Sequence, residues 1–337
     1  MRNMNNYTPD LAIVVTTYQR QELLKKLLDS IVSLEMQPTR VIVVDNEGSA
    51  ETKRIVETYS PLMNYIAMED NSGGAGGFSR GIGEAYRLGH DWIWAMDDDV
   101  AVLPNAIEKL SVWTKQTEKD FDSGKGLAEV TTVFQGLRKN FDGSFFYWQY
   151  RFLNKLGIPN PIAPSSFKPG ESSRPMNTAC FEGSLFHRSL VEAIGLPDAR
   201  FFIYSDDTVY GYLASKQTKM LLITDYILER TRVLENVQIG SVRKLNATSD
   251  MARFYIMRNR GHIAHYLRIN TEYNPIIFGF GTFLTFTKEI IRLFITKEFK
   301  TGMNRLIAGM REAKKIRNDK TWQPYSSVKS LESLERP

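Results

Sequence analysis

The sequence predicts an α/β fold in which a parallel sheet is flanked by helices and followed by a C-terminal helical region. Short apolar, β-branched runs alternate with helical patterns over residues 11–99, which is typical of a parallel sheet. The alternation ends near residue 240, and helical patterns follow it. Residues 241–337 contain 18 Lys and Arg against 8 Asp and Glu, whereas residues 1–240 contain 25 against 30. We therefore predict an acidic domain, 1–240, and a basic helical region, 241–337.

Each element follows from a local pattern. Short apolar runs predict buried strands at 11–18, 40–46, 64–70 and 91–99. Between these strands, apolar residues at helical spacing predict helices at 23–34 and 51–59, and a glycine-rich loop, 71–81, leads into a third helix. Further along, a strand is expected within 127–137 and a strand followed by a helix within 181–195.

The composition narrows the class of protein. Hydrophobic residues make up 42% and charged residues 24%, so the chain can bury a sizeable core. Cys180 is the single cysteine, which precludes an intrachain disulfide and fits a reducing compartment, and we expect it to be a small buried side chain. The N-terminal apolar run is too short for a signal peptide. Charged residues interrupt the apolar segment 274–295, so it is not expected to span a membrane.

Three consecutive acids, Asp97, Asp98 and Asp99, follow the fourth strand. In an open parallel sheet, ligands bind beyond the carboxyl ends of the strands. Alternation along the strand would place Asp97 and Asp99 on one side and Asp98 on the other. Clustered carboxylates repel one another, and a divalent cation, which prefers oxygen ligands, would offset that repulsion. The alternative is a solvated turn or a helix N-cap formed by Asp99 or Asn105.

Polar groups follow the other strands too. Thr17 and Arg20 come after the first strand, Asp45 and Asn46 end the second, and the glycine-rich segment 71–81 follows the third. Glycine lets a backbone approach a ligand closely, and a helix N-terminus favours phosphate. The spacing matches neither the dinucleotide fingerprint nor the phosphate loop of nucleotide triphosphatases. Together these strand ends predict a pocket for a nucleotide whose diphosphate is bridged by a metal.

The same motifs resemble those of a known family. VVTTYQR, VVDN, NSGGAGGFSRG and MDDD are similar, in this order, to the motifs of glycosyltransferase family 2, whose GT-A fold is a Rossmann-like, mainly parallel mixed sheet flanked by helices. The pairing of GGAGGFSRG with WAMDDD most resembles the bacterial galactofuranosyltransferases. FEGSLFHRSLVEAIGLP and FFIYSDDTVYG continue the match, so the resemblance spans roughly residues 10–240.

This resemblance implies a role for each matching residue. Asp97 and Asp99 would hold Mn²⁺ or Mg²⁺, and Asp98 would lie nearer the sugar or ribose. Asp207 would be the base that takes a proton from an acceptor hydroxyl, and Asp206 would position it. The residues expected to contact the uridine nucleotide or its sugar are Thr17, Arg20, Asp45, Asn46, Asn71, Gly73, Gly74, Gly76 and Gly77. The alternative for the later acid pair is a helix N-terminus capped by Ser205.

The sequence departs from the galactofuranosyltransferase pattern at one point. Those enzymes often supply a histidine to the metal shortly after the base, and residues 221–236 contain none. Glu229 or a water molecule could substitute. The four histidines of the chain are expected to be structural or on the surface; they are His90, His187, His262 and His265.

The basic region carries two further patterns. Tyr255, Arg258 and Asn259 form a Y-x-x-R-N arrangement that resembles a segment found after the catalytic domain in several transferases of this family. It suggests either an Arg258 contact with phosphate or a packing helix. Residues 274–320 combine an apolar helix face with many cations, which suits a helix lying on an anionic membrane surface, or else packing on the body or on a dimer partner. No recognised nucleic-acid-binding module accompanies the cations.

The sequence therefore predicts a metal-dependent, inverting glycosyltransferase, peripheral to the cytoplasmic face of the bacterial plasma membrane. The expected donor is UDP-galactofuranose, and the expected acceptor is a lipid-linked glycan of cell-surface polysaccharide synthesis. A rhamnosyl- or galactopyranosyltransferase is the nearest alternative. A non-catalytic glycan- or nucleotide-binding module and a nucleotidyltransferase are more distant ones, and the oligomeric state stays open.

Overall fold

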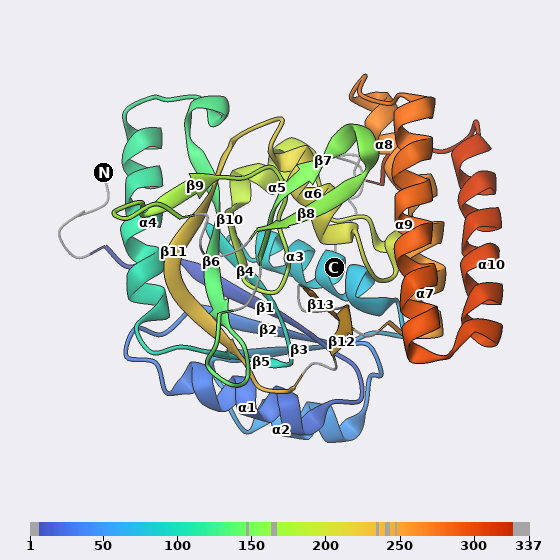
Figure 1. Cartoon of the computed structure of the whole chain (residues 1–337). Coiled ribbons are helices and arrows are strands. Elements are labelled where there is room, and N and C mark those ends of the chain that lie inside the picture. Colours follow the sequence, from blue (N-terminus) through green and yellow to red (C-terminus); the bar gives the residue numbers. More distant parts are fainter. Residues whose placement is uncertain are drawn as a thin grey trace.

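One large sheet organises the molecule (Figure 1). The computed structural model describes residues 7–145, 148–162, 167–233, 236–239, 243–246 and 248–325. The strand order is β3-β2-β1-β4-β10-β6-β11-β5, and β9 pairs with β11. The strands are β1 (Leu11–Thr17), β2 (Arg40–Asp45), β3 (Met63–Ala67), β4 (Trp92–Asp97), β5 (Val100–Val102), β6 (Thr131–Lys139), β9 (Ser173–Pro175), β10 (Ser184–His187) and β11 (Lys219–Arg230).

The sheet is mixed and mainly parallel, as predicted. β1 runs parallel to β2 and β4, β2 runs parallel to β3, and β6 runs parallel to β11. β10 is antiparallel to both of its neighbours, and β5 and β9 are antiparallel to β11. The carboxyl ends of β1, β2, β3 and β4 therefore meet at one edge of the sheet, where the predicted strand-end motifs lie.

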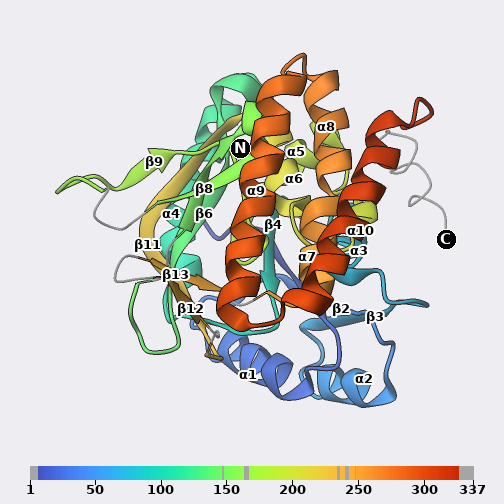
Figure 2. The ribbon, with the colours of Figure 1, turned by 45° about the vertical axis from the view of Figure 1, so that its right-hand side comes forward.

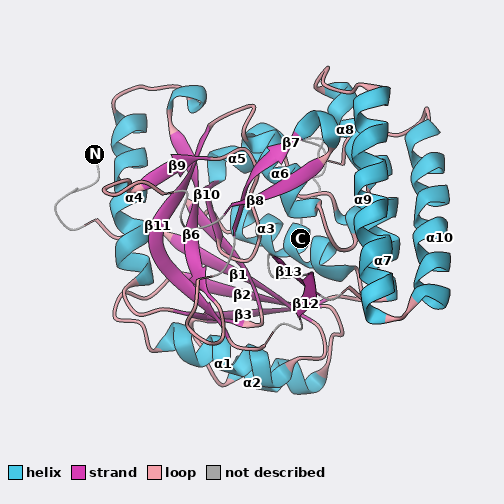
Figure 3. Cartoon of the chain, viewed as in Figure 1, coloured by secondary structure: helices cyan, strands magenta, loops and turns pink. Residues whose placement is uncertain are grey.

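Alternating side chains build an apolar layer on each face of the sheet. Leu11, Ile13 and Val15 of β1 pack with α1 (Gln21–Val32), α2 (Ala50–Glu57) and α4 (Ala106–Asp122). Ala12 and Val14 pack with α3 (Gly73–Arg87), α5 (Arg188–Ile194) and α6 (Asp206–Ala214). In Figure 3 the sheet lies between these two sets of helices.

The glycine-rich segment forms the first turns of α3, where the sequence predicted a loop before the helix. A Cβ on Gly77 would lie 2.7 Å from Thr16 Cγ2, and one on Gly81 would lie 2.4 Å from Val14 Cγ1. The missing side chains let the helix axis approach β1 closely. Gly73 has a φ of +68°, and its Cβ would lie 2.1 Å from the Phe202 carbonyl oxygen, so glycine is required where the helix begins.

The C-terminal region consists of the helices α7 (Asp250–Arg258), α8 (Arg260–Ile269), α9 (Pro275–Thr296) and α10 (Phe299–Asn318). α9 and α10 lie at the right-hand edge of Figure 1. A single apolar cluster joins this region to the body: Phe201, Val209 and Tyr212 pack with Ala264 and Leu267. The predicted division near residue 240 thus does not coincide with a gap between cores. None of the described helices has the length and apolar character needed to cross a bilayer.

Two small hairpins complete the described chain. They pair β7 (Trp148–Leu153) with β8 (Ile158–Ile162), and β12 (Asn236–Ile239) with β13 (Arg243–Asn246). The second hairpin straddles residue 240, so the strand content extends slightly beyond the predicted boundary.

Candidate active site

The acid triplet lies where β4 ends. Asp97 is the last strand residue, and Asp98 and Asp99 form the turn into β5. Asp98 is 2% exposed and accepts hydrogen bonds from Thr17 Oγ1 at 2.8 Å and from Arg20 Nη1 at 3.0 Å. Asp99 Oδ2 lies 2.7 Å from Nε of Arg232. Because the chain turns at Asp98, these contacts rather than strict strand alternation orient the last two carboxylates.

The carboxylate of Asp97 differs from those of its neighbours, because it forms no hydrogen bond or ion pair with the described residues. Burial raises the pKa of Asp97 well above its usual range, and repulsion from Asp99, Glu182 and Asp98 adds to the effect. Among the described residues, the Asp97 carboxylate thus has no cationic or hydrogen-bonding partner of its own, although the more distant Arg20 partly opposes the rise in its pKa.

The donor atoms at this position fit a hard divalent cation. Asp97 and Asp99 offer carboxylate oxygens, and a cation would offset the repulsion that raises the pKa of Asp97. Within the described residues no cluster of three or more His, Cys, Asp or Glu side chains is arranged to hold a metal. Two carboxylates suit an ion that takes its remaining ligands from substrate phosphates and water, as Mg²⁺ commonly does.

A buried ion-pair cluster lies next to the triplet, and the sequence did not predict it. Glu182 receives hydrogen bonds from Nε and Nη2 of Arg230, both at 2.9 Å, and forms an ion pair with Arg138. Burial alone would raise the pKa of Glu182, but the two guanidinium groups outweigh it and lower that pKa. The sequence feature that could have indicated buried ion pairs here was the pair of arginines, Arg230 and Arg232, at the end of a strand.

The turn 180–183 connects the triplet with the later acid pair. The N–H of Gly183 donates to the Ala95 carbonyl of β4 at 2.8 Å. At the other end of the turn, the Cys180 side chain and the Phe181 backbone lie beside the Asp207 carboxylate and favour its charged form. The turn therefore brings the two acidic groups to the same region of the sheet edge. Cys180 is partly buried, whereas a buried side chain was expected, and burial together with Asp207 raises the pKa of its thiol.

Asp206 and Asp207 are the first two residues of α6. Asp206 is buried, and this burial together with repulsion from Asp207 raises the pKa of Asp206 to about 8. Burial also raises the pKa of Asp207, although the nearby Cys180 side chain and a hydrogen bond from the Thr208 N–H favour its charged form. Ser205 precedes the helix, but its side chain makes no capping hydrogen bond.

The residues predicted to meet the nucleotide lie along the ends of β1, β2 and β3. Asp45 is fully buried and accepts hydrogen bonds from the N–H groups of Glu47 and Ser49 and from the Tyr65 hydroxyl. Asn46 Oδ1 accepts from the Ser72 hydroxyl at 3.0 Å. These bonds order the loops that follow β2 and β3.

The segment that follows β3 offers an exposed side chain and one open glycine. Asn71 is exposed and accepts a hydrogen bond from the Gly73 N–H. A Cβ on Gly76 would meet the Ser72 hydroxyl at 2.2 Å, whereas one on Gly74 would meet nothing within 4 Å. Gly74 is thus the position of this set with room beside it, while Gly73, Gly76 and Gly77 have packing roles. Their contacts with a donor stay predictions.

The four histidines have structural contacts, as expected. His90 pairs with Asp10, and His187 accepts from a backbone N–H at the start of α5. His262 accepts from the Trp322 indole, and His265 stacks on the same ring. Glu229 lies on β11 one residue before Arg230, and its part in binding a metal stays a prediction.

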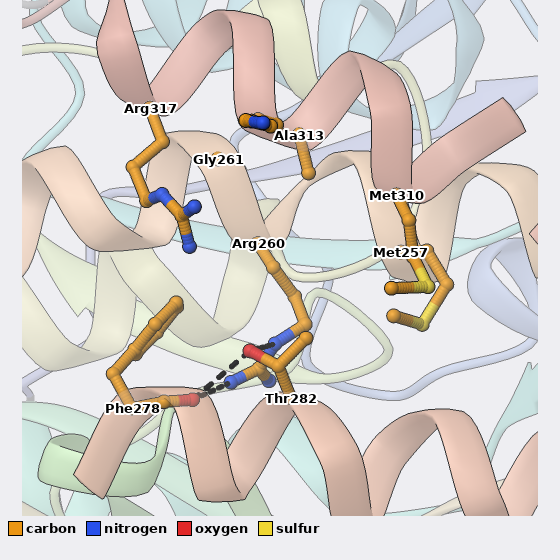
Figure 4. Close-up of a pocket in the computed structure, with 9 residues that line it drawn as sticks. Met257, Arg260, Gly261, Phe278, Thr282, Met310, Ala313 and Arg317 are labelled. Atoms are coloured by element: carbon orange, nitrogen blue, oxygen red, sulfur yellow. Dashed lines mark hydrogen bonds between the residues drawn. The ribbon is translucent and has the colours of Figure 1, made fainter. Parts of the chain in front are cut away.

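A cavity of about 160 Å³ lies apart from the acids, among α7, α8, α9 and α10 (Figure 4). It is lined by Met257, Arg260, Gly261, Phe278, Thr282, Met310, Ala313, Lys314 and Arg317. Arg260 donates to the carbonyls of Leu156, Gly157 and Phe278, and burial lowers its pKa to about 9. The cavity is thus apolar with a basic margin.

Comparison with known proteins gives one family and one fold. The model of the family described as Glycosyl transferase family 2 matches residues 12–195. The galactofuranosyltransferase GlfT1 of Mycolicibacterium smegmatis is 31% identical over 266 residues, which cover 76% of this chain and 83% of that protein.

Solved structures resemble most of the chain at low sequence identity. TarS of S. aureus superposes with a TM-score of 0.56 at 14% identity, covering 90% of this chain and 80% of that one. GalNAc-T7, solved with UDP, GalNAc and Mn²⁺, superposes with a TM-score of 0.51 at 13% identity, covering 73% of this chain and 47% of that one. This likeness shows the fold.

The raised pKa of Asp206 predicts a pH-dependent stability. A carboxyl that holds its proton more tightly in the folded than in the unfolded state loses stability as pH rises from the ordinary Asp value towards about 8. Denaturant unfolding at pH 5 and pH 8 should show wild-type stability falling with pH, and Asp206→Asn should lose much less. An equal loss in both proteins would contradict this assignment, and Asp122→Asn, at an exposed position of α4, serves as the control.

Proposed function

The chain belongs to glycosyltransferase family 2, and from this we propose that it transfers galactofuranose from UDP-galactofuranose, with inversion, to a hydroxyl of a lipid-linked glycan. The observation that carries the proposal is the convergence of two acidic groups, Asp97–Asp99 and Asp206–Asp207, on the turn 180–183. One group suits the diphosphate side of a sugar nucleotide. The other suits a base for the attacking hydroxyl, and an inverting transfer needs both.

The donor side is assigned to the strand ends. Asp97 and Asp99 would hold Mn²⁺ or Mg²⁺, and the bound ion would stabilise the negative charge on the leaving diphosphate. The M. smegmatis relative is named a galactofuranosyltransferase, and GalNAc-T7 was solved with UDP and Mn²⁺, which supports a uridine-diphosphate donor. Thr17, whose hydroxyl donates to Asp98, would help to fix that carboxylate, and Arg20 would add a positive charge beside the diphosphate.

The acceptor side is assigned to the start of α6. Asp207 would accept the proton of the attacking hydroxyl, and its raised pKa makes it a stronger base than an exposed aspartate. With a pKa of about 8, Asp206 keeps its proton at neutral pH, so it does not add a second negative charge beside the base. The hydrogen bond from the Thr208 N–H favours the charged form of Asp207, which supports Asp207 as the base and Asp206 as its positioning partner.

A lipid-linked acceptor implies contact with a membrane, and α9 supplies a surface for it. Ile276, Phe280, Phe283 and Phe294 follow one another along one side of this helix and are 82%, 55%, 61% and 66% exposed. Figure 2 is turned so that the right-hand side of Figure 1 comes forward, and in this view α9 lies in front of the body. The neighbouring helix α10 carries the basic run 311–317. We assign this surface to an anionic lipid bilayer, because a peripheral helix binds through apolar side chains flanked by cations.

A panel of sugar nucleotides tests the donor. With Mn²⁺ present, the protein should release UDP from UDP-galactofuranose faster than from UDP-galactopyranose or dTDP-rhamnose, and EDTA should stop the reaction. If the protein turned over only a different sugar nucleotide, that sugar nucleotide would become the assigned donor instead of UDP-galactofuranose. Pyrophosphate release from UTP and a sugar phosphate would favour a nucleotidyltransferase. No turnover of any donor would favour a non-catalytic module.

Two substitutions should separate the roles of the two acidic groups. Asp207→Asn should lower the transfer rate by about 10²- to 10⁴-fold while leaving Mn²⁺-dependent UDP binding intact, because a base acts on the acceptor. Asp97→Asn should weaken UDP binding in Mn²⁺ but not in EDTA. Thermal shift and transfer assays measure both effects. If Asp207→Asn transferred sugar at the wild-type rate, the base would have to be reassigned, and Asp122→Asn is the control.

Vesicle flotation tests the lipid surface. The wild-type protein should float with vesicles that contain phosphatidylglycerol and much less with phosphatidylcholine alone, because the surface combines apolar and basic residues. The double variant Phe280→Ser/Phe283→Ser should lose most of this binding. Phe141→Ser removes an exposed phenylalanine from the body and should not change it. Equal flotation of the wild type and the double variant would rule out the α9 surface.

A further inference from the structure

The segment just before α6 has an unusual backbone. Phe202, Tyr204 and Ser205 have φ angles of +62°, +67° and +69°. Residues other than glycine rarely adopt positive φ, and a bulky aromatic there is an outlier that persists only when its surroundings hold it. Asp206 and Asp207 follow directly, and the Ser205 carbonyl accepts the first helical hydrogen bond, from Val209. The conformation of 202–205 therefore sets where the acid pair begins.

Asn259, at the junction of α7 and α8, holds this segment. Its side chain is fully buried, and Nδ2 donates to the carbonyls of Phe201, Ile203 and Tyr204 at 3.1, 2.8 and 2.9 Å. A buried carbonyl without a donor is costly, so one amide group satisfies several successive acceptors of an irregular chain.

The other two residues of the Y-x-x-R-N arrangement contact the same segment. Arg258 Nη1 donates to the Arg200 carbonyl at 2.8 Å. The Tyr255 ring stacks on Phe202, with ring centres 4.8 Å apart and an interplanar angle of 15°. All three residues of the arrangement thus act on 200–205, which favours the packing alternative for Arg258 over a phosphate contact.

The segment 202–205 also contacts the first turn of α3, which follows the strand end assigned to the sugar-nucleotide donor. The Phe202 carbonyl accepts from the N–H of Ala75 at 3.0 Å and lies where a Cβ on Gly73 would be. The strained segment is therefore fixed between the first turn of α3 and the junction of α7 and α8. A shift in it would move the acid pair relative to the donor-binding strand ends.

We propose that Asn259, supported by Tyr255, is a positioning residue for Asp207: it holds the strained segment 202–205 so that the base meets the acceptor hydroxyl. The basic C-terminal region then takes part in the chemistry through the backbone, without contacting the substrate itself. This inference rests on the proposed assignment of Asp207 as the base.

Steady-state kinetics of Asn259→Ala tests the proposal. Loss of the amide should let the acid pair shift, and a misplacement of about 1 Å can cost about 100-fold in rate, so kcat for transfer should fall by about that factor. The donor KM and the Mn²⁺-dependent affinity for UDP should stay near wild type, because the strand ends are untouched. Asn270→Ala removes an asparagine of the same helical region that donates only to the Tyr266 carbonyl, and it should keep wild-type kcat.

A second pair of variants tests the same positioning role if Asn259→Ala does not fold. Tyr255→Ala removes the ring that stacks on Phe202 and should lower kcat, whereas Tyr255→Phe keeps the ring and should retain it. Wild-type kcat in Asn259→Ala or in Tyr255→Ala would overturn the proposal. So would a loss of UDP affinity parallel to the loss of kcat, since that indicates general damage.

The same measurements separate this inference from the proposed function. If Asp207→Asn abolishes transfer while Asn259→Ala retains it, the positioning role fails and the base assignment stands. If Asp207→Asn leaves transfer intact, the base assignment fails, and the positioning role fails with it.

Discussion

The burial of several carboxylates at one sheet edge, with repulsion between neighbouring ones, is the constraint to which the rest of the site responds. Removing a charge from water is costly unless an opposite charge or hydrogen bonds compensate it. The acids differ in the ion pairs and hydrogen bonds that offset this cost. These differences separate structural acids from acids that we propose to be chemically active. The carboxylates belong to Asp97, Asp98, Asp99, Glu182, Asp206 and Asp207.

Two of the acids have cationic partners, with different results: the arginines lower the pKa of Glu182, whereas burial outweighs the contacts of Asp98 and raises its pKa. Glu182 lies between the guanidinium groups of Arg138 and Arg230, and Asp98 accepts from Thr17 and Arg20. Breaking the buried pairs of Glu182 by removing one partner typically costs about 3–5 kcal/mol, so Glu182 and its two arginines hold the edge rigid.

Asp97 and Asp206 are not compensated in this way, and for both the charged form is disfavoured. Leaving a buried acid in that state lowers stability, and sites of this kind are commonly functional. The lack of a cationic partner beside the Asp97 carboxylate among the described residues supports the proposed assignment of a cation to it.

The sequence predicted the fold because apolar runs determine which elements face the core. The positions of β1, β2, β3 and β4 and the strand-end placement of the acids follow from such local patterns. The ion-pair cluster could not be predicted, because Arg138, Glu182 and Arg230 come from three separate strands or turns and meet only through the order β10-β6-β11. The prediction of a loop in the glycine-rich segment was wrong for a similar reason. Its glycines allow α3 to pack closely against β1, and this packing depends on the tertiary structure rather than on the local sequence.

The division proposed near residue 240 rests on charge and on the end of the strand–helix alternation. Charge changes sign there, and charge describes the surface, whereas cores are defined by apolar contacts. Phe201 and Tyr212 of the body share one cluster with Ala264 and Leu267 of the helical region. A strained segment such as 202–205 needs support from a rigid neighbour, and this shared core supplies it. The C-terminal helices therefore belong physically to the active-site framework on their inner side, while the outer side of α9 remains free to meet a different environment.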